Sequence, residues 1–179
     1  LTKLMTAMVV LDAKLDMDEI IEIDSADVDR IKYSTSRVAV GAKLTRRDAL
    51  HLALMSSDNR AAASLARTFP GGNDGFKAAV RKKTRQLGMT HTVIEEPTGL
   101  SPHNRSNAGD LVKMAKASTE YPEIVRMTTE TKDVFDIKGR DVNFSNTNRL
   151  VGAKGWDVGL SKTGFTNEAG RCLIMNITA

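Results

Sequence analysis

The sequence predicts an α+β fold, with an antiparallel sheet packed on helices and an all-helical subdomain. Leu4 to Leu11 is apolar apart from Thr6, which predicts a helix that is buried on all sides. Helical patterns fill the middle of the chain, and strand patterns follow Thr131. We expect a single domain over residues 1-179 that is incomplete at both ends, with a helical subdomain at roughly 45-128 and sheet-side segments at 1-44 and 129-179.

After the first helix, the chain is expected to form a short strand, a loop and a second helix. Ile20 to Ile23 predicts the strand, and the polar stretch from Asp24 to Ser36 predicts an exposed loop. Thr45 is followed by Asp48 three residues later, which is similar to a capping box and marks the start of a helix. The apolar positions that we expect this helix to bury are Leu50, Leu52, Ala53 and Leu54.

Four further helical segments follow the break at Ser56-Ser57-Asp58. Pro97, Gly99 and Pro102 interrupt them and predict a loop from Glu95 to Arg105. Capping and breaking residues set the expected limits of the helices. These limits are Asn59 to Phe69, Phe76 to Leu87 closed by Gly88, Ala108 to Ala117 capped by Ser106, and Pro122 to Met127.

Strand patterns dominate the end of the chain. Lys138-Gly139-Arg140 and Asn167 to Gly170 read as the turns of two hairpins. We expect the first, buried helix to lie beneath the sheet that these strands form. The predicted strands are Val134 to Ile137, Val142 to Phe144, Val158 to Phe165 and Leu173 to Ile177.

Composition excludes several classes of protein. The chain is 41% hydrophobic and 27% charged, which is ordinary for a globular protein, and no run approaches the ~18 apolar residues of a membrane span. The net charge of +4 is scattered, and with 4% aromatics and no base-stacking motif we expect no nucleic-acid partner. His51, His91 and His103 lack zinc-site spacing, so we expect no metal, and His51 reads as structural. Cys172 is expected in the core.

Three short motifs carry residues that are suited to chemistry. They are Thr2-Lys3 at the head of the buried helix, Ser57-Asp58-Asn59 at a helix junction and Lys162-Thr163-Gly164 on a late strand. Taken singly, each has an ordinary interpretation: a lysine reaching the surface, a helix cap, a solvated strand lysine with a bulge. Their order along one chain, with a lysine opening a buried helix, points to a shared site.

That order resembles the motifs Ser-x-x-Lys, Ser-x-Asn and Lys-Thr-Gly of the penicillin-binding proteins and serine β-lactamases. Residues 1–12 are similar to the nucleophile helix of the low-molecular-mass penicillin-binding proteins. Residues 54–66 are similar to the second motif of D-alanyl-D-alanine endopeptidases of the penicillin-binding protein 7/8 type. Further similar stretches, which extend the resemblance over nearly all 179 residues, are 70–72, 87–89, 96–101, 146–148 and 162–167.

The family resemblance also implies a nucleophile that this sequence does not contain. In the family the serine lies three residues before the motif lysine, at the position just before Leu1. We expect that serine to carry a covalent adduct such as a ring-opened β-lactam. The alternative is a truncated or inactive chain that lacks the serine.

The resemblance assigns roles to seven residues. Lys3 would be the general base, which requires its pKa to fall from ~10.4 toward neutrality through burial and the charge of Lys162. Ser57 would relay the proton to the leaving amine, and Asn59 would hold Lys3 and the substrate amide. The expected substrate-binding residues are Lys162 and Thr163 for a carboxylate, Gly164 for close approach of the peptide, and Phe165 for an oxyanion hole through its backbone N–H.

The implied activity is that of a serine-type DD-peptidase that cleaves D-alanyl cross-links of peptidoglycan through an acyl-enzyme. Its implied partners are peptidoglycan stem peptides, with β-lactams as covalent inhibitors, and it needs no cofactor. We expect a periplasmic protein whose signal peptide lies outside this chain. Glu95 and Glu96 do not match the deacylating glutamate motif of class A β-lactamases, so slow release of penicillins is expected. The alternatives are a D-alanyl-D-alanine carboxypeptidase or β-lactamase on the same fold, and a non-catalytic peptidoglycan-binding relative.

Overall fold

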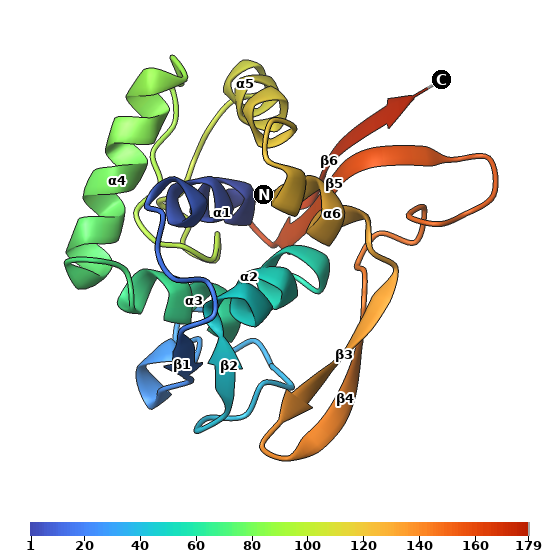
Figure 1. The fold of residues 1–179 in the computed structure, drawn as a ribbon. Helices are drawn as coiled ribbons and strands as arrows, with labels where there is room; N and C mark the ends of the chain where they lie inside the picture. The colour runs from blue at the N-terminus through green and yellow to red at the C-terminus, as the bar shows by residue number, and fades with distance from the viewer. Residues whose placement is uncertain (179) are drawn as a thin grey trace.

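The fold is α+β, with helices gathered on one side and β-hairpins at the periphery (Figure 1). A computed structural model describes residues 1–178. The helices are α1 (Thr2–Asp12), the 3-10 helix η1 (Ser25–Asp27), α2 (Arg46–Met55), α3 (Asn59–Arg67), α4 (Gly72–Gln86), α5 (Ala108–Ser118) and α6 (Pro122–Thr129). The strands are β1 (Ile20–Glu22), β2 (Lys43–Thr45), β3 (Lys132–Ile137), β4 (Arg140–Ser145), β5 (Asp157–Thr166) and β6 (Gly170–Thr178).

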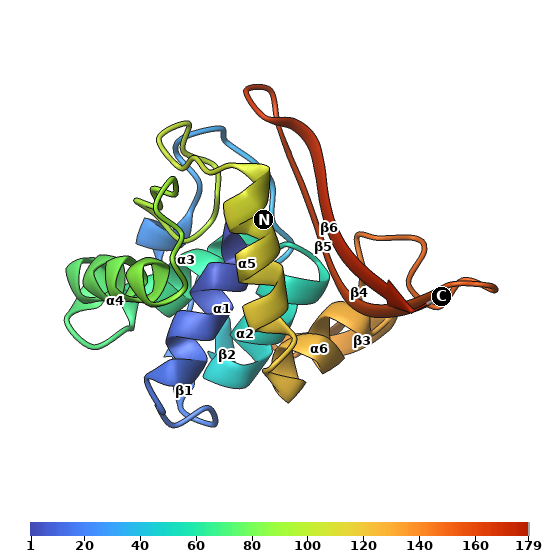
Figure 2. The same ribbon diagram turned by 90° about the horizontal axis from the view of Figure 1, so that it is seen from above.

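Helix α1 occupies the centre of the helical part, as its apolar sequence predicted. Residues 3–10 are all buried, and Figures 1 and 2 show the helix enclosed by its neighbours. It packs against α2, α3, α4, α5 and α6. The expectation that α1 lies beneath the strands is wrong, because the helices that pack on the β5–β6 hairpin are α6 and α5. A helix that is apolar all round needs cover on every side, which surrounding helices supply and a sheet alone does not.

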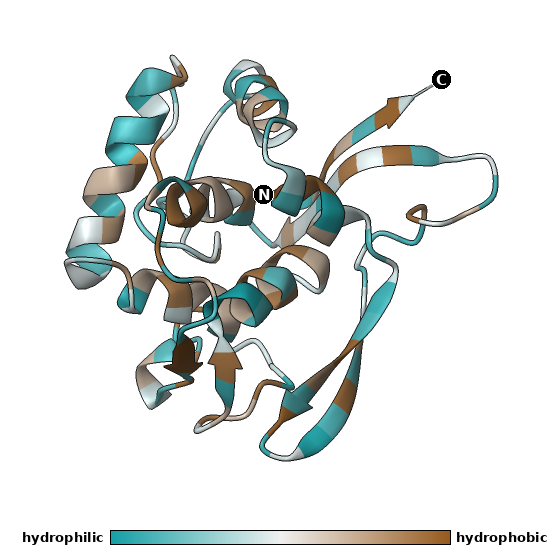
Figure 3. Ribbon diagram, in the orientation of Figure 1, coloured by the Kyte–Doolittle hydropathy of each residue, from teal (hydrophilic) through white to brown (hydrophobic). Residues whose placement is uncertain are grey.

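The strands pair antiparallel, as predicted. Within residues 1–178 they form three separate two-stranded sheets, β1–β2, β3–β4 and β5–β6, instead of the single sheet that was expected. Lys138 and Gly139 have positive φ values of 55° and 80°, which matches the predicted tight turn between β3 and β4. Figure 3 shows hydrophobic and hydrophilic residues interspersed along β3 and β4, and Figure 2 shows β5–β6 standing to one side of the helices.

The helix boundaries follow their caps. Thr45 Oγ1 accepts a hydrogen bond from Asp48 N over 3.0 Å, which confirms the predicted start of α2. The cap of α5 is Asn107 rather than Ser106, because Asn107 Oδ1 accepts from Asp110 N over 2.8 Å. Helix α4 begins at Gly72, a turn earlier than the apolar pattern starting at Phe76 indicated.

Two local expectations from the sequence are wrong. The segment from Asp24 to Ser36 is not simply an exposed loop, since it contains η1 and buries Asp27 and Asp29. Both carboxylates accept backbone N–H groups, which satisfies them without solvent. Cys172 is half-buried and lines a cleft instead of lying in the core, because β6 turns that face toward the cleft. The proposed division into a helical subdomain and sheet-side segments stays a prediction.

Candidate active site

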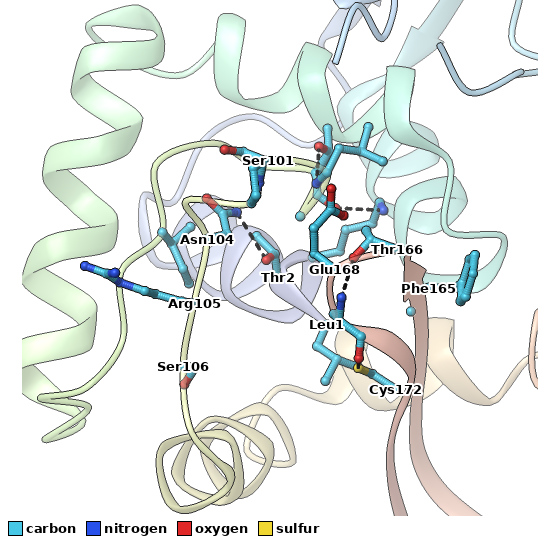
Figure 4. Close-up of a pocket in the computed structure, with 18 of the residues that line it drawn as sticks. Leu1, Thr2, Ser101, Asn104, Arg105, Ser106, Phe165, Thr166, Glu168 and Cys172 are labelled. Carbon is cyan, nitrogen blue, oxygen red and sulfur yellow. Dashed lines mark hydrogen bonds between the residues drawn. The ribbon is translucent and has the colours of Figure 1, made fainter. Parts of the chain in front are cut away.

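A cleft of about 480 Å³ lies between the start of α1, the α2–α3 junction, the loop before α5 and strand β5. Figure 4 shows Leu1 and Thr2 on one side, with Ser101 and Asn104 of the loop nearby and Phe165, Thr166 and Cys172 on the hairpin. Six of the seven residues singled out in the sequence line this cleft: Lys3, Ser57, Asn59, Thr163, Gly164 and Phe165. The seventh, Lys162, does not line the cleft itself, but its Nζ donates to the hydroxyl of Ser57, which does.

Lys3 does not extend to the surface, since it is only 5% exposed. Its Nζ donates to Asn59 Oδ1 over 2.8 Å, to the carbonyl oxygen of Thr98 over 3.1 Å and to Ser57 Oγ over 3.2 Å. These partners come from α3, from the loop before α5 and from the α2–α3 junction. The buried lysine is therefore fully hydrogen-bonded inside the cleft.

Lys162 is 1% exposed, so the solvated-lysine interpretation fails for it as well. Its Nζ donates to the carbonyl oxygen of Thr163 over 2.8 Å and to Ser57 Oγ over 2.9 Å. The hydroxyl of Ser57 therefore lies between two lysine amines. This arrangement can carry a proton from one amine to a neighbouring group through a single hydroxyl.

Both amines have lowered pKa values. Burial lowers the pKa of Lys3 to about 8, although the carboxylates of Glu96 and Asp58 oppose the shift. Burial, together with the charge of Lys3, lowers the pKa of Lys162 well below its ordinary value. Burial, which was expected to act together with the charge of Lys162, is the main cause at both lysines, and the repulsion acts between the two amines as a pair. Two adjacent amines that both disfavour a charge leave one neutral amine available near pH 7.

Ser57 is held in an unusual backbone conformation. Its φ is 55°, in the left-handed region that residues with a Cβ seldom adopt. The next residue, Asp58, caps α3 by accepting from Ala61 N over 2.9 Å. The break between α2 and α3 thus turns sharply at Ser57, and this turn points the hydroxyl toward both lysines.

The third motif forms the opposite wall of the cleft. Thr163 lines the cleft, and its Oγ1 lies 2.6 Å from Thr147 Oγ1, which places a second hydroxyl beside it. A Cβ added to Gly164 would lie 3.1 Å from the backbone nitrogen of Leu1, so the chain's own first residue accounts for the close approach at this glycine. The Phe165 side chain is 65% exposed, and only its backbone is suited to a role in the cleft.

Sequence reasoning missed the groups that hold Lys3 and Asn59 in place. Thr98 contributes its carbonyl oxygen, and Glu96 accepts from the N–H groups of Thr98 and Gly99 over 2.8 and 2.6 Å. Asn59 Nδ2 donates to Ser34 Oγ over 3.0 Å. The sequence did carry a signal for the contact between Glu96 and the Thr98-Gly99 turn. A carboxylate directly before Pro-Thr-Gly can accept hydrogen bonds from the backbone of the turn that follows. Ser34 carried no such signal.

A separate group of potential metal ligands lies away from the cleft. His51 Nε2 is 3.0 Å from Glu130 Oε2, and His51 Nδ1 is 3.9 Å from Asp133 Oδ2. One ligand atom from each residue lies within 4.8 Å of the others. The residues come from α2, the end of α6 and β3, so spacing in the sequence did not predict this grouping.

A family model described as D-alanyl-D-alanine carboxypeptidase matches residues 1–179. The chain belongs to this family. Two relatives are named D-alanyl-D-alanine endopeptidase. The one from Pseudomonas aeruginosa is 49% identical over 180 residues, which cover 99% of this chain and 58% of that protein. The one from Escherichia coli is 49% identical over 177 residues, which cover 98% of this chain and 57% of that protein.

Solved structures of similar proteins agree with the fold. The Streptomyces DD-transpeptidase has a TM-score of 0.89 and 26% identity, covering 99% of this chain and 74% of that one. The D-alanyl-D-alanine carboxypeptidase from Mycobacterium tuberculosis has a TM-score of 0.80 and 28% identity, covering 99% and 72%. The predicted fold class and family resemblance are confirmed. The chain spans little more than half the length of the two endopeptidases, and no helix among residues 1–178 has the length and apolar character to cross a membrane.

Proposed function

We propose that this chain is the catalytic part of a serine-type DD-peptidase that hydrolyses D-alanyl cross-links of peptidoglycan through an acyl-enzyme. The observation that carries the proposal is the hydroxyl of Ser57 held 3.2 Å from Lys3 Nζ and 2.9 Å from Lys162 Nζ in one cleft. Membership of a peptidase family and two relatives named as endopeptidases support the same activity.

The proposed nucleophile is a serine that precedes Leu1 in the full-length protein. Such a residue lies three positions before Lys3, which puts the two side chains on the same helix face. The backbone nitrogen of Leu1, to which that serine would be joined, packs against Gly164 at the cleft wall. The serine would therefore lie between Lys3 and the Lys-Thr-Gly strand.

In the acylation step, neutral Lys3 takes the proton of the serine hydroxyl as the oxygen attacks the D-alanyl carbonyl carbon. A C–O bond forms, and the carbonyl oxygen becomes an oxyanion that accepts from the backbone N–H groups of Phe165 and the serine. Collapse of this intermediate breaks the C–N bond of the cross-link. The proton passes from Lys3 through Ser57 to the leaving amine, and water later hydrolyses the serine ester.

Lys162 and Thr163 are the proposed binding groups for a substrate carboxylate. A bound carboxylate raises the pKa of a nearby amine, so it favours the proton on Lys162 and leaves Lys3 neutral. Substrate binding would then select the reactive protonation state of the two lysines. Asn59, whose Oδ1 lies 2.8 Å from Lys3 Nζ, is proposed to hold the base and the substrate amide.

A β-lactam offers a strained cyclic amide to the same serine in place of the D-alanyl peptide bond, so we propose covalent inhibition by these compounds. Stem peptides of the cell wall are the proposed partners, and the proposed location is the periplasm. Trimming of a terminal D-alanine is the second candidate function, because the matching family model is described as a carboxypeptidase.

Purified cross-linked muropeptides test the proposal on the full-length protein. Release of monomers identifies an endopeptidase, whereas loss of only the terminal D-alanine identifies a carboxypeptidase. Labelling of the same protein with a fluorescent penicillin measures whether a covalent acyl-enzyme forms. If the protein neither cleaves the muropeptides nor becomes labelled, it is a non-catalytic cell-wall binding protein, and the proposed function is overturned.

A further inference from the structure

We propose that Ser34 and Asp29, which lie in the loop before β2, are positioning residues that fix the side-chain amide of Asn59 and thereby aim the lone pair of the Lys3 amine. The proposal rests on the proposed function of Lys3 as general base. It concerns the contact between Ser34 and Asn59 of the Ser57-Asp58-Asn59 motif, which no sequence pattern indicated. Asp29, Ser34, Asn59 and Lys3 form one continuous chain of hydrogen bonds.

The chain begins at a carboxylate that can only accept. Asp29 is 9% exposed, and its Oδ2 accepts from Ser34 Oγ over 2.6 Å and from Ser34 N over 2.7 Å. Its Oδ1 accepts from the backbone N–H groups of Ile31 and Lys32 over 2.8 and 3.0 Å. Burial alone would raise the pKa of Asp29, but these hydrogen bonds outweigh it and lower the pKa. The charged form of Asp29 therefore fixes the direction of the bond from Ser34.

That direction decides the orientation of Asn59. A serine hydroxyl has one proton, and Ser34 uses it to donate a hydrogen bond to Asp29. The oxygen of Ser34 can therefore only accept a hydrogen bond from any other group. Asn59 Nδ2 lies 3.0 Å from Ser34 Oγ and donates to it. The amide oxygen of Asn59 must then face the other way, toward Lys3 Nζ at 2.8 Å.

The orientation of Asn59 in turn aims Lys3. A neutral lysine amine has two N–H groups and one lone pair. Asn59 Oδ1 and the carbonyl oxygen of Thr98 are both acceptors, at 2.8 and 3.1 Å, so they occupy the two N–H groups. In the charged amine the third N–H donates to Ser57 Oγ over 3.2 Å; in the neutral amine the lone pair replaces that N–H and faces the same hydroxyl side of the cleft. A base aimed in this way can take a proton without first rotating.

Without Ser34, the Asn59 amide is free to turn its NH₂ group toward Lys3. That group would donate to the lone pair and stabilise the neutral amine, so both the aim of the base and its pKa would change. The charged groups around Lys3 stay in place, namely Lys162 on β5, Glu96 in the loop before α5 and Asp58 at the α2–α3 junction. A shift in the pKa of Lys3 would therefore report the orientation of Asn59.

The test uses full-length protein and compares Ser34→Ala, Ser34→Thr and Thr35→Ala, the last an exposed neighbour that serves as the control. We expect Ser34→Ala to slow acylation by penicillin about tenfold, a fraction of what a general base contributes. We also expect the acidic limb of its pH–rate profile to move to lower pH. Ser34→Thr keeps the hydroxyl and should restore both properties, and Thr35→Ala should match the unsubstituted protein.

An NMR titration of the Lys3 side chain separates this inference from the proposed function. A lower pKa of Lys3 in Ser34→Ala supports the hydrogen-bond network even if no variant reacts with penicillin. A lack of reaction with penicillin would contradict only the proposed function. If Ser34→Ala is acylated more slowly but its acidic limb and the pKa of Lys3 are unchanged, Ser34 has only a structural role. That result, or a Ser34→Ala variant identical to the unsubstituted protein, overturns the inference.

Discussion

Ser57 Oγ lies 2.9 Å from Lys162 Nζ although the two residues are 105 positions apart in the chain. The contact joins the α2–α3 junction to strand β5 across the floor of the cleft. A hydroxyl in this place can exchange a proton with either lysine only while the backbone of Ser57 keeps its left-handed turn. The geometry of the cleft is therefore linked to local backbone strain.

Replacing Ser57 should separate stability from activity. We expect Ser57→Gly and Ser57→Ala both to abolish acylation by penicillin, because each lacks the hydroxyl. Ser57→Gly should nevertheless be more stable than Ser57→Ala by ~1 kcal/mol, since glycine adopts a positive φ without the penalty that a Cβ brings. Urea unfolding of both variants measures the difference.

Lys138 provides the matched control for that comparison, because its φ is also 55° but it lies in the β3–β4 turn. Lys138→Gly should be more stable than Lys138→Ala by a similar amount and should be acylated normally. Equal stability of the two Ser57 variants would show that the left-handed turn at Ser57 carries no strain.

Gly164 should tolerate no side chain. Its added Cβ would lie 3.1 Å from the backbone nitrogen of Leu1, whereas a Cβ at Gly159 on the same strand meets nothing closer than 3.7 Å. We expect Gly164→Ala to lose at least about tenfold in acylation rate, because a shift of the nucleophile helix misplaces the reacting groups. Gly159→Ala is the control and should keep its rate. Similar rates in both variants would contradict the steric argument.

The seven candidate residues could be found from the sequence because the three motifs carry distinctive residue types in a fixed order. The groups that hold them could not. Thr98 acts through its backbone carbonyl, which any residue supplies, and Ser34 reaches Asn59 from a loop without periodicity. Likewise the sequence of α1 predicted burial on all sides, but not which elements would provide it, since that depends on tertiary packing.

Glu96 should set the pH at which the base becomes active. Its carboxylate raises the pKa of Lys3, which burial has lowered to about 8. If neutral Lys3 is the reactive form, acylation rises as the pH increases through that pKa. Removing the charge with Glu96→Gln lowers the pKa further, so the acidic limb should move to lower pH. Stopped-flow acylation across pH 5 to 10 measures it, and an unmoved limb would contradict the assignment.

The exposed neighbour Glu95 gives the control for Glu96. Glu95→Gln changes the net charge by the same amount, but Glu95 is exposed and is not a cause of the shift at Lys3. Its acidic limb should coincide with that of the unsubstituted protein. Equal shifts in the two variants would mean that overall charge, rather than the position of Glu96, sets the pKa of Lys3.

His51 should make the fold sensitive to acid. Burial lowers the pKa of His51 below its ordinary 6.5, although Glu130 and Asp133 oppose the shift. The unfolded chain therefore binds this proton at a higher pH than the folded protein does. The stability contributed by neutral His51 is complete above pH ~6.5 and is lost as the pH falls toward the lower, folded value, by at most ~1.4 kcal/mol per pH unit.

Urea unfolding at several pH values between 5 and 8 measures this contribution. We expect His51→Gln to reduce the loss of stability below pH 6.5, because glutamine has no proton to bind. His103→Gln is the control: its side chain is exposed, so the acid dependence should stay as in the unsubstituted protein. A steeper loss of stability in His51→Gln would mean that the ion pairs with Glu130 and Asp133 outweigh burial and that the folded protein favours the charged imidazole.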